Sequence, residues 1–185
     1  MKLSFLDIEA TSLTADSGFI VGFGLMFEDG EWIHEFLEGT VIEGEKQLLK
    51  KLLTNIEEVD IIVTWYGDGF DIPMIVSRSL LHGLDPTNIL MKEHIDLCIY
   101  AKKLLKLSDY SLDSVARFFN IPKKIELKGK DMPPIYMKAI SGEREALKLI
   151  KEHCYDDLNA LRLIYKIMAR TVSILRAKNS NIRNT

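Results

Sequence analysis

The sequence predicts an α/β fold in which helices flank a mixed β-sheet. Two observations lead to this prediction. The first part of the chain contains three strand-like stretches separated by short turns, which is the pattern of an antiparallel meander. The rest of the chain alternates short apolar strands with helical stretches, which is typical of parallel strands joined through helices. We therefore expect the antiparallel meander and the parallel strands to share one sheet.

The meander is expected to consist of strands at residues 3–9, 18–28 and 31–38. Alternation is strongest in 18–28, where one face carries bulky apolar side chains and the other includes Gly22 and Gly24. Glycine inside a strand often marks a place where another part of the chain approaches the backbone. We therefore expect a close contact on the glycine face of this strand.

The later elements follow from their apolar spacing. Further strands are predicted at 60–65 and 94–97, and helices at 45–59, from about 73 to 81, directly after 97, at 111–120 and from about 143 to 175. The segment KKIELKGKDMPPIY (123–136) is basic, contains two prolines and is expected to be a loop. We expect a single domain over residues 1–175, followed by a basic, disordered tail at 176–185.

The composition is typical of a soluble protein, with 47% hydrophobic and 28% charged residues. No stretch is apolar for long enough to span a membrane, and no signal peptide is recognised. The two cysteines suit a reducing compartment, so a cytoplasmic location is expected. The net charge of −3 argues against a protein that coats DNA, but every charged residue after Asp157 is basic. That basic end either contacts a phosphate backbone or is a solvated helix face.

The stretch LSFLDIEA places two acids on one face of a strand. Side chains alternate along a strand, so Asp7 and Glu9 point to the same side as Leu3 and Phe5. Two carboxylates so close together repel each other unless a cation or a proton neutralises one of them. The pair therefore indicates a metal site, an unusual pKa, or exposure at the end of the strand.

Two further acids stand where functional groups often gather. Asp71 follows a buried strand and a glycine-rich turn, at the start of a helix, where it either reaches a site or caps the helix. His153 and Asp157 lie four residues apart in an otherwise apolar stripe of the last helix. An acid in a row that faces the core needs a partner, unless the helix rolls to expose it or the two form a buried ion pair.

Three motifs, taken in order, resemble one known family. FLDIEAT, WYGDGFDIP and HCYDDLNAL are similar to the three motifs of the DEDD-type 3′–5′ exonucleases of ribonuclease-H-like fold. The resemblance is strongest to the proofreading domain of family B DNA polymerases and its stand-alone relatives, and it covers residues 3–168. Each motif alone is weakly specific, whereas their order and spacing together are specific.

The resemblance implies hydrolysis of phosphodiester bonds with two metal ions. Asp7, Glu9 and Asp157 would bind one Mg²⁺ or Mn²⁺, and Asp7 would bridge to a second ion that Asp71 reaches directly or through water. Hard divalent ions prefer such oxygen ligands. The implied substrate is the 3′ end of a single strand, with DNA expected rather than RNA. A protein partner is compatible with the sequence but is not identified by it.

The chain departs from the family at the residue that assists the attacking water. The family has a tyrosine four residues before the last aspartate or a histidine five before it, whereas here His153 stands four before Asp157. We expect His153 to act as general base or to position the water, with Tyr155 as the alternative. Tyr66 and Gly69 stand where polymerase domains commonly carry asparagine.

The candidate substrate-binding residues are Thr11, Tyr66 and Phe70. The two aromatic rings could stack on a terminal base, or could belong to the core. Lysines at 102–106 and at 123–130 either guide phosphates or are merely solvated. Two functional alternatives remain open at this point. One is an exoribonuclease that processes RNA, and the other is a non-catalytic module of the same fold that binds nucleic acid or a protein partner.

Overall fold

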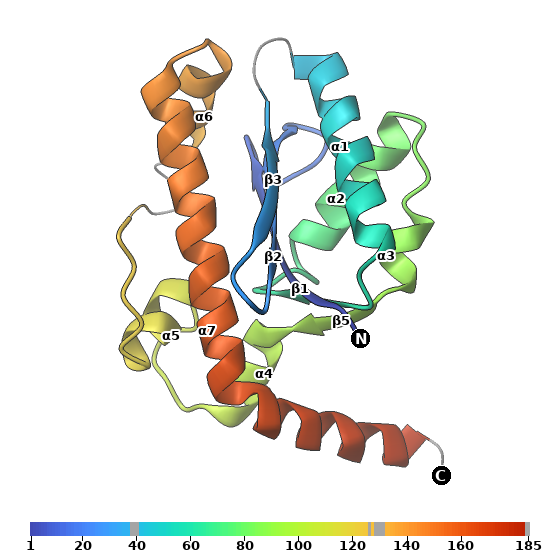
Figure 1. Ribbon diagram of the computed structural model, residues 1–185, viewed down its shortest axis with the longest axis vertical. Helices are drawn as coiled ribbons and strands as arrows, with labels where there is room; N and C mark the ends of the chain where they lie inside the picture. The colour runs from blue at the N-terminus through green and yellow to red at the C-terminus, as the bar shows by residue number, and fades with distance from the viewer. Residues whose placement is uncertain (38–40, 126, 128–131, 184–185) are drawn as a thin grey trace.

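The computed structural model describes residues 1–37, 41–125, 127 and 132–183 (Figure 1). The strands are β1 (Leu3–Ala10), β2 (Ile20–Phe27), β3 (Trp32–Phe36), β4 (Ile61–Thr64) and β5 (Glu93–Asp96). The helices are α1 (Val41–Glu57), α2 (Asp71–Leu81), α3 (Thr87–Met91), α4 (Leu97–Leu104), α5 (Leu112–Phe118), α6 (Met132–Ile140) and α7 (Arg144–Arg183). None of the helices in these described ranges is both long enough and apolar enough to cross a membrane.

The strands form one mixed sheet, as predicted. Their order is β3-β2-β1-β4-β5; the pairs β3–β2 and β2–β1 are antiparallel, and the pairs β1–β4 and β4–β5 are parallel. In Figure 1, α7 lies on one side of this sheet, and α1, α2 and α3 lie on the other. The central strand β1 is therefore covered on both faces, which buries Phe5, Leu6 and Ile8. The predicted α/β class is confirmed.

The glycines of β2 let α7 approach the sheet closely. Gly24 is paired with Asp7 of β1, and a Cβ atom at Gly24 would lie only 2.9 Å from the sulfur of Cys154 on α7. It would also collide with Leu158, one turn further along the same helix. At Gly22 a Cβ atom would collide with the ring of Phe36. The predicted close contact is confirmed, and at Gly24 its partner is the helix that carries His153 and Asp157.

Two predictions for the second half of the chain are wrong. The segment expected to be a loop contains the start of α6, because Pro133 and Pro134 fall in the first turn, where a helix does not need their missing N–H groups. The last helix does not end near Leu175 but continues to Arg183, so most of the tail predicted to be disordered is helical. Val172 is buried, and Arg176 pairs with Glu93 of β5, so this part of α7 is held against the domain.

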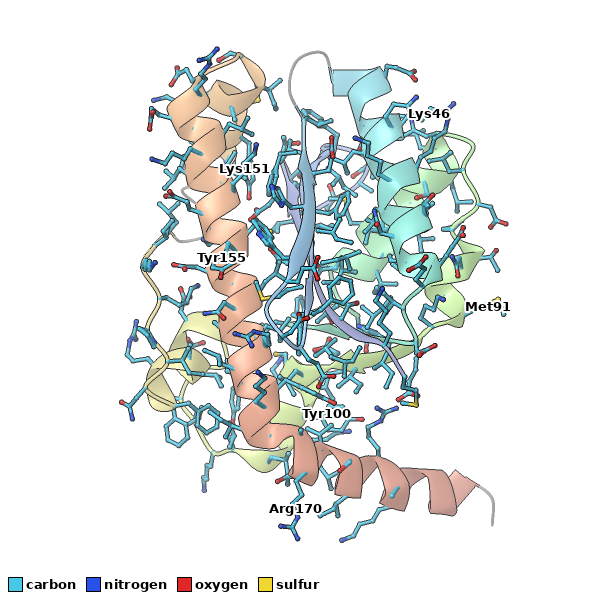
Figure 2. All side chains as sticks on the ribbon, viewed as in Figure 1. Lys46, Met91, Tyr100, Lys151, Tyr155 and Arg170 are labelled. Atoms are coloured by element: carbon cyan, nitrogen blue, oxygen red, sulfur yellow. The ribbon has the colours of Figure 1, made fainter. Side chains whose placement is uncertain are left out.

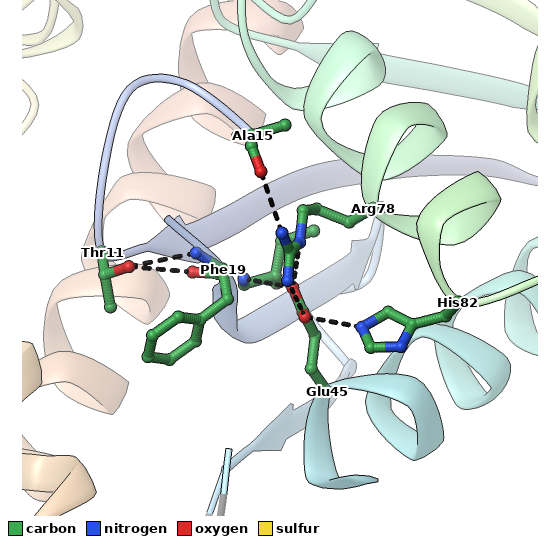
Figure 3. Close-up of polar contacts among 7 residues, drawn as sticks. Thr11, Ala15, Phe19, Glu45, Arg78 and His82 are labelled. Atoms are coloured by element: carbon green, nitrogen blue, oxygen red, sulfur yellow. Dashed lines mark hydrogen bonds and ion pairs between the residues drawn. The ribbon is translucent and has the colours of Figure 1, made fainter. Parts of the chain in front are cut away.

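A buried ion cluster ties the loop after β1 to helices α1 and α2 (Figure 3). Glu45 of α1 is almost fully buried and accepts hydrogen bonds from Arg78 Nε at 2.8 Å and from the backbone N–H of Ile20 at 2.7 Å. The His82 ring is 2.7 Å from the same carboxylate. Burial alone would raise the pKa of Glu45, but these hydrogen bonds hold that pKa below its usual value. Arg78 also donates to the carbonyl of Ala15, at 2.9 Å.

Replacing Arg78 with alanine should destabilise the fold by about 3 kcal/mol, because it leaves the buried Glu45 charge without its main partner. Urea denaturation measures this loss. The control is Lys51→Ala, which removes an exposed ion pair with Glu35 (2.8 Å) and should cost less than about 1 kcal/mol. Equal losses in the two variants would show that the Glu45 cluster does not stabilise the loop after β1.

Candidate active site

Asp7 and Glu9 lie on the face of β1 that is turned toward α7. This follows from strand alternation, since Phe5 on the same face contacts Tyr165 of α7 at 5.6 Å between ring centroids. Glu9 is only 5% exposed and Asp7 is partly buried. Exposure at the end of a strand, one of the three explanations left open by the sequence, therefore does not apply.

Asp71 is directed at β1 from the start of α2. Its Oδ1 atom accepts a hydrogen bond from the backbone N–H of Ile8 at 3.1 Å, and its side chain is buried. The cap position of α2 is occupied by Phe70, without a capping side chain. The structure therefore favours a role for Asp71 in a shared site over a role as helix cap.

His153 and Asp157 face the same region from α7. Their side chains approach to 3.7 Å, between His Nδ1 and Asp Oδ1, and both are mostly buried. The other members of the predicted stripe are buried, namely Ala146, Ile150, Leu161, Ile164 and Met168. Lys123 reaches in from the segment after α5, with Nζ 2.5 Å from Asp157, and it also pairs with Asp113. The sequence did not single out this lysine as a partner of Asp157.

Sequence reasoning also missed two uncharged residues of the cluster. The Tyr136 hydroxyl on α6 donates a hydrogen bond to Glu9, and this residue lay in the segment expected to be a loop. The sulfur of Cys154 and one oxygen each of Asp7 and Glu9 all lie within 4.8 Å of one another. The helical spacing of Cys154 relative to Ile150 and Asp157 could have placed it in the site, because it fits the same inward-facing stripe.

Asp7, Glu9 and Asp71 resist ionisation in the absence of a cation. Burial, followed by the charges of Glu9, Asp71 and Asp157, raises the pKa of Asp7 well above its usual value. Burial raises the pKa of Glu9 to about 8 and that of Asp71 to about 7. Burial and the neighbouring Glu9 also raise the pKa of Tyr136, so it remains a donor. Lys123 supplies only one positive charge to these four acids, and crowded carboxylate oxygens are the ligands that a hard divalent cation prefers.

A cavity of about 200 Å³ opens onto this cluster. Its lining includes Glu9, Thr11, Phe70, Tyr136 and His153, together with Met132 and Pro133 of α6. Thr11 Oγ1 accepts a hydrogen bond from the backbone N–H of Phe19 at 3.1 Å, which fixes the loop at the mouth of the cavity. The structure thus brings together Thr11 and Phe70, two of the three predicted substrate-binding residues.

Tyr66 and Tyr155 are not brought to this cavity. Tyr66 has a positive φ of 63° and is 54% exposed. The Nζ atom of Lys102 lies over the Tyr66 ring, 5.6 Å from the ring centroid. Tyr155 lies on α7 (Figure 2), where its ring packs edge-on against Trp32 at 5.2 Å. It lines a separate hollow beside β3. Of the lysines predicted to guide phosphates, Lys128 and Lys130 lie outside the described residues.

Comparison with known proteins shows which family the chain belongs to. The family model of the RNase_H superfamily matches residues 4–169, which is most of the chain. The chain belongs to the RNase_H superfamily. The acid cluster at the centre of this RNase_H domain therefore lies within a fold whose nucleases generally use divalent metal ions.

The sequence is also similar to archaeal DNA polymerases. It is 32% identical over 113 residues to a DNA polymerase of Methanocaldococcus jannaschii, covering 50% of this chain and 7% of that protein. It is 35% identical over 96 residues to DNA polymerase 1 of Sulfolobus acidocaldarius, covering 41% of this chain and 11% of that protein. The aligned part is thus a small fraction of these relatives.

The fold is shared with a family B DNA polymerase of known structure. The enzyme from Pyrobaculum calidifontis superimposes with a TM-score of 0.78 at 16% identity, over 91% of this chain and 24% of that one. The resemblance to DNA polymerases that the motifs indicated therefore agrees with the sequence similarity, and the fold is the one found in this family B enzyme. Membership in the superfamily supports a nuclease-type function in general and a nucleic acid as substrate.

Proposed function

We propose that this RNase_H-superfamily domain is a metal-dependent 3′–5′ exonuclease that acts on single strands, on DNA rather than RNA. The observation that carries the proposal is the convergence of Asp7, Glu9, Asp71, Asp157 and His153 in one cluster, of which Glu9 and His153 line a small cavity. Four acids from two helices and a strand would repel one another without a shared ligand. Trimming of DNA ends in repair would suit such an activity, and the two free, buried cysteines suit the cytoplasm.

The residues present fit a pair of Mg²⁺ or Mn²⁺ ions. Asp7, Glu9 and Asp157 would hold one ion, and Asp7 and Asp71 would hold the other. When bound, such ions make water more acidic at neutral pH and stabilise charge on a phosphate and its leaving oxygen. The protein contributes to this fit through Ile8, whose N–H orients Asp71, and through Tyr136, whose hydroxyl orients Glu9.

The other side chains at the cavity are suited to orient the substrate and to accept a proton from the attacking water. His153 lines the cavity and can take a proton from the attacking water, because a neutral imidazole is a suitable base near pH 7. Phe70 offers a ring for the terminal base, and Thr11 lies beside it on the loop after β1. Helix α6 closes the other side of this small cavity, which favours a strand end over a duplex.

Replacing His153 with alanine should lower kcat about 10²- to 10⁴-fold at neutral pH, because the water loses its proton acceptor. Single-turnover hydrolysis measures the chemical step. Tyr155→Ala is the matched control on the same helix and should retain at least about half of the rate, since its ring packs on Trp32 away from the cavity. A fast His153→Ala variant beside a slow Tyr155→Ala variant would transfer the role to Tyr155.

The proposed function is tested by degradation of single-stranded DNA and RNA of one sequence, each labelled at the 5′ end. We expect a ladder that shortens from the 3′ end with Mg²⁺ or Mn²⁺, that disappears with chelator and that forms faster on DNA. A faster ladder on RNA would make the protein an exoribonuclease.

A second candidate function is non-catalytic binding of nucleic acid or of a protein partner. It is favoured by the ion pair between Lys123 and Asp157, which already supplies one acid of the cluster with a positive charge. No ladder on either strand, together with retained binding of single strands, would establish this second function instead.

A further inference from the structure

We propose that the acid cluster also forms a site for a thiophilic divalent ion, of the Zn²⁺ or Cd²⁺ class, with Cys154 as its sulfur ligand. Asp7 and Glu9 would supply the oxygen ligands. An ion held in this way would occupy the ligands that hydrolysis requires and would therefore inhibit the enzyme. The binding site stands on its own geometry, whereas the inhibition rests on the proposed function.

The geometry places three ligand atoms of two chemical kinds together. The Cys154 sulfur and an oxygen from each of Asp7 and Glu9 all lie within 4.8 Å of one another. They come from β1 and α7, which pack directly against each other. The thiol therefore points at the two acids rather than along the helix.

The close packing of α7 on β2 restricts where this thiol can go. The sulfur is held so near Gly24 that a Cβ atom there would be 2.9 Å away, and Leu158 closes the space beside it. Cys154 itself is fully buried. A sulfur confined between a glycine and two carboxyl groups needs only side-chain adjustments to share an ion with them.

The chemistry of the ligands separates two classes of metal. Mg²⁺ takes oxygen ligands and gains nothing from sulfur, whereas Zn²⁺ and its heavier analogue Cd²⁺ bind thiolate strongly. Two carboxylates and one thiolate are three protein ligands, which leaves a coordination position for water. The thiol would release its proton to solvent on coordination. The same cluster can therefore hold a catalytic ion through oxygens and an inhibitory ion through oxygen and sulfur.

Cys98 is a buried cysteine that, within the part of the chain that the structure describes, does not lie beside a pair of carboxyl groups. It lies at the start of α4, is buried, and its sulfur donates a hydrogen bond to the carbonyl of Tyr110 at 3.8 Å. Cys98 does not belong to any group of three candidate ligands among the described residues. It is therefore a matched control for Cys154, because both thiols are free and shielded from water.

The test is a titration of the metal-free protein with Cd²⁺, followed by the ultraviolet charge-transfer band of a cadmium–thiolate bond. Wild type and Cys98→Ser should each develop the band of one thiolate per chain. Cys154→Ser, which keeps a hydroxyl able to donate to Asp7, should lose the band and bind Cd²⁺ at least about tenfold more weakly by calorimetry. Asp7→Asn should also weaken Cd²⁺ binding, and thermal melts of all variants confirm that they are folded.

Two outcomes would overturn the proposal. One is a band that persists in Cys154→Ser, and the other is saturable Cd²⁺ binding by wild type without any band. Failure of the proposed function looks different, because it is an absence of Mg²⁺-dependent hydrolysis in wild type and Cys98→Ser whatever Cd²⁺ does. If hydrolysis is present, Cd²⁺ at its binding concentration should stop it in both of these proteins.

Discussion

Asp7→Asn should abolish hydrolysis and, at the same time, make the metal-free protein more stable. The substitution keeps the shape of the side chain but removes a charge that burial and three neighbouring acids oppose. The rate should fall at least about 10³-fold, or roughly 4 kcal/mol of barrier, because the residue shared by both proposed ions loses its charge. Thermal melting in chelator at pH 8 should show a higher Tm than wild type.

The opposite signs of these two effects make the test specific. A residue that merely supports the fold loses activity and stability together when it is replaced. Glu152→Gln is the control, since it removes an exposed acid of α7 that is not part of the cluster, and both the rate and the Tm should stay near wild type. A lower Tm for Asp7→Asn in chelator would contradict the interpretation of Asp7 as a ligand held at a cost to stability.

The metal-free protein should lose stability as the pH rises from about 4 to about 8. Burial raises the pKa of Glu9 from 4.5 to about 8 and that of Asp71 from 3.8 to about 7. An acid with a raised pKa in the folded state keeps its proton there while the unfolded chain has already lost its own. Its contribution to stability is therefore complete below the unfolded pKa and disappears as the pH passes the folded pKa.

The size of this effect is several kcal/mol. A shift of about three units in one group corresponds to about 4 kcal/mol, and the groups of this cluster titrate together. Urea denaturation in chelator across this pH range measures the loss, and the same series with Mn²⁺ should remove most of it because an ion compensates the charges. If the free energy of unfolding of the metal-free protein stays constant or rises between pH 4 and 8, the pKa values of these acids are not raised in the folded state.

The positions of the acids could be predicted from the sequence because they depend on local periodicity. Asp7 and Glu9 share a face in any strand, and His153 and Asp157 share one in any helix. The glycine face of β2 likewise follows from strand alternation, and it indicates a close approach without indicating that Cys154 is the partner. The class of fold follows from the two-residue period of the strands and the 3.6-residue period of the helices.

What the sequence left undetermined depends on contacts between distant segments. Lys123 lies 34 positions before Asp157, and nothing in a run of lysines distinguishes the one that enters the core. The two prolines before Tyr136 favour a loop at the level of sequence, although prolines in the first turn of a helix are well tolerated. The helical stripe can place Cys154 on the inward face of α7, but only the packing of α7 on the sheet brings its sulfur to Asp7 and Glu9.

The most direct measurement is a titration of the metal-free protein with Mn²⁺ at pH 8, followed by the electron paramagnetic resonance signal of the free ion. We expect wild type and Glu152→Gln to bind two ions per chain, and Asp7→Asn to bind neither with comparable affinity. This result would establish that the buried acids are kept together to hold divalent ions. Equal Mn²⁺ binding by wild type and Asp7→Asn would contradict that claim, and with it the proposed mechanism of hydrolysis.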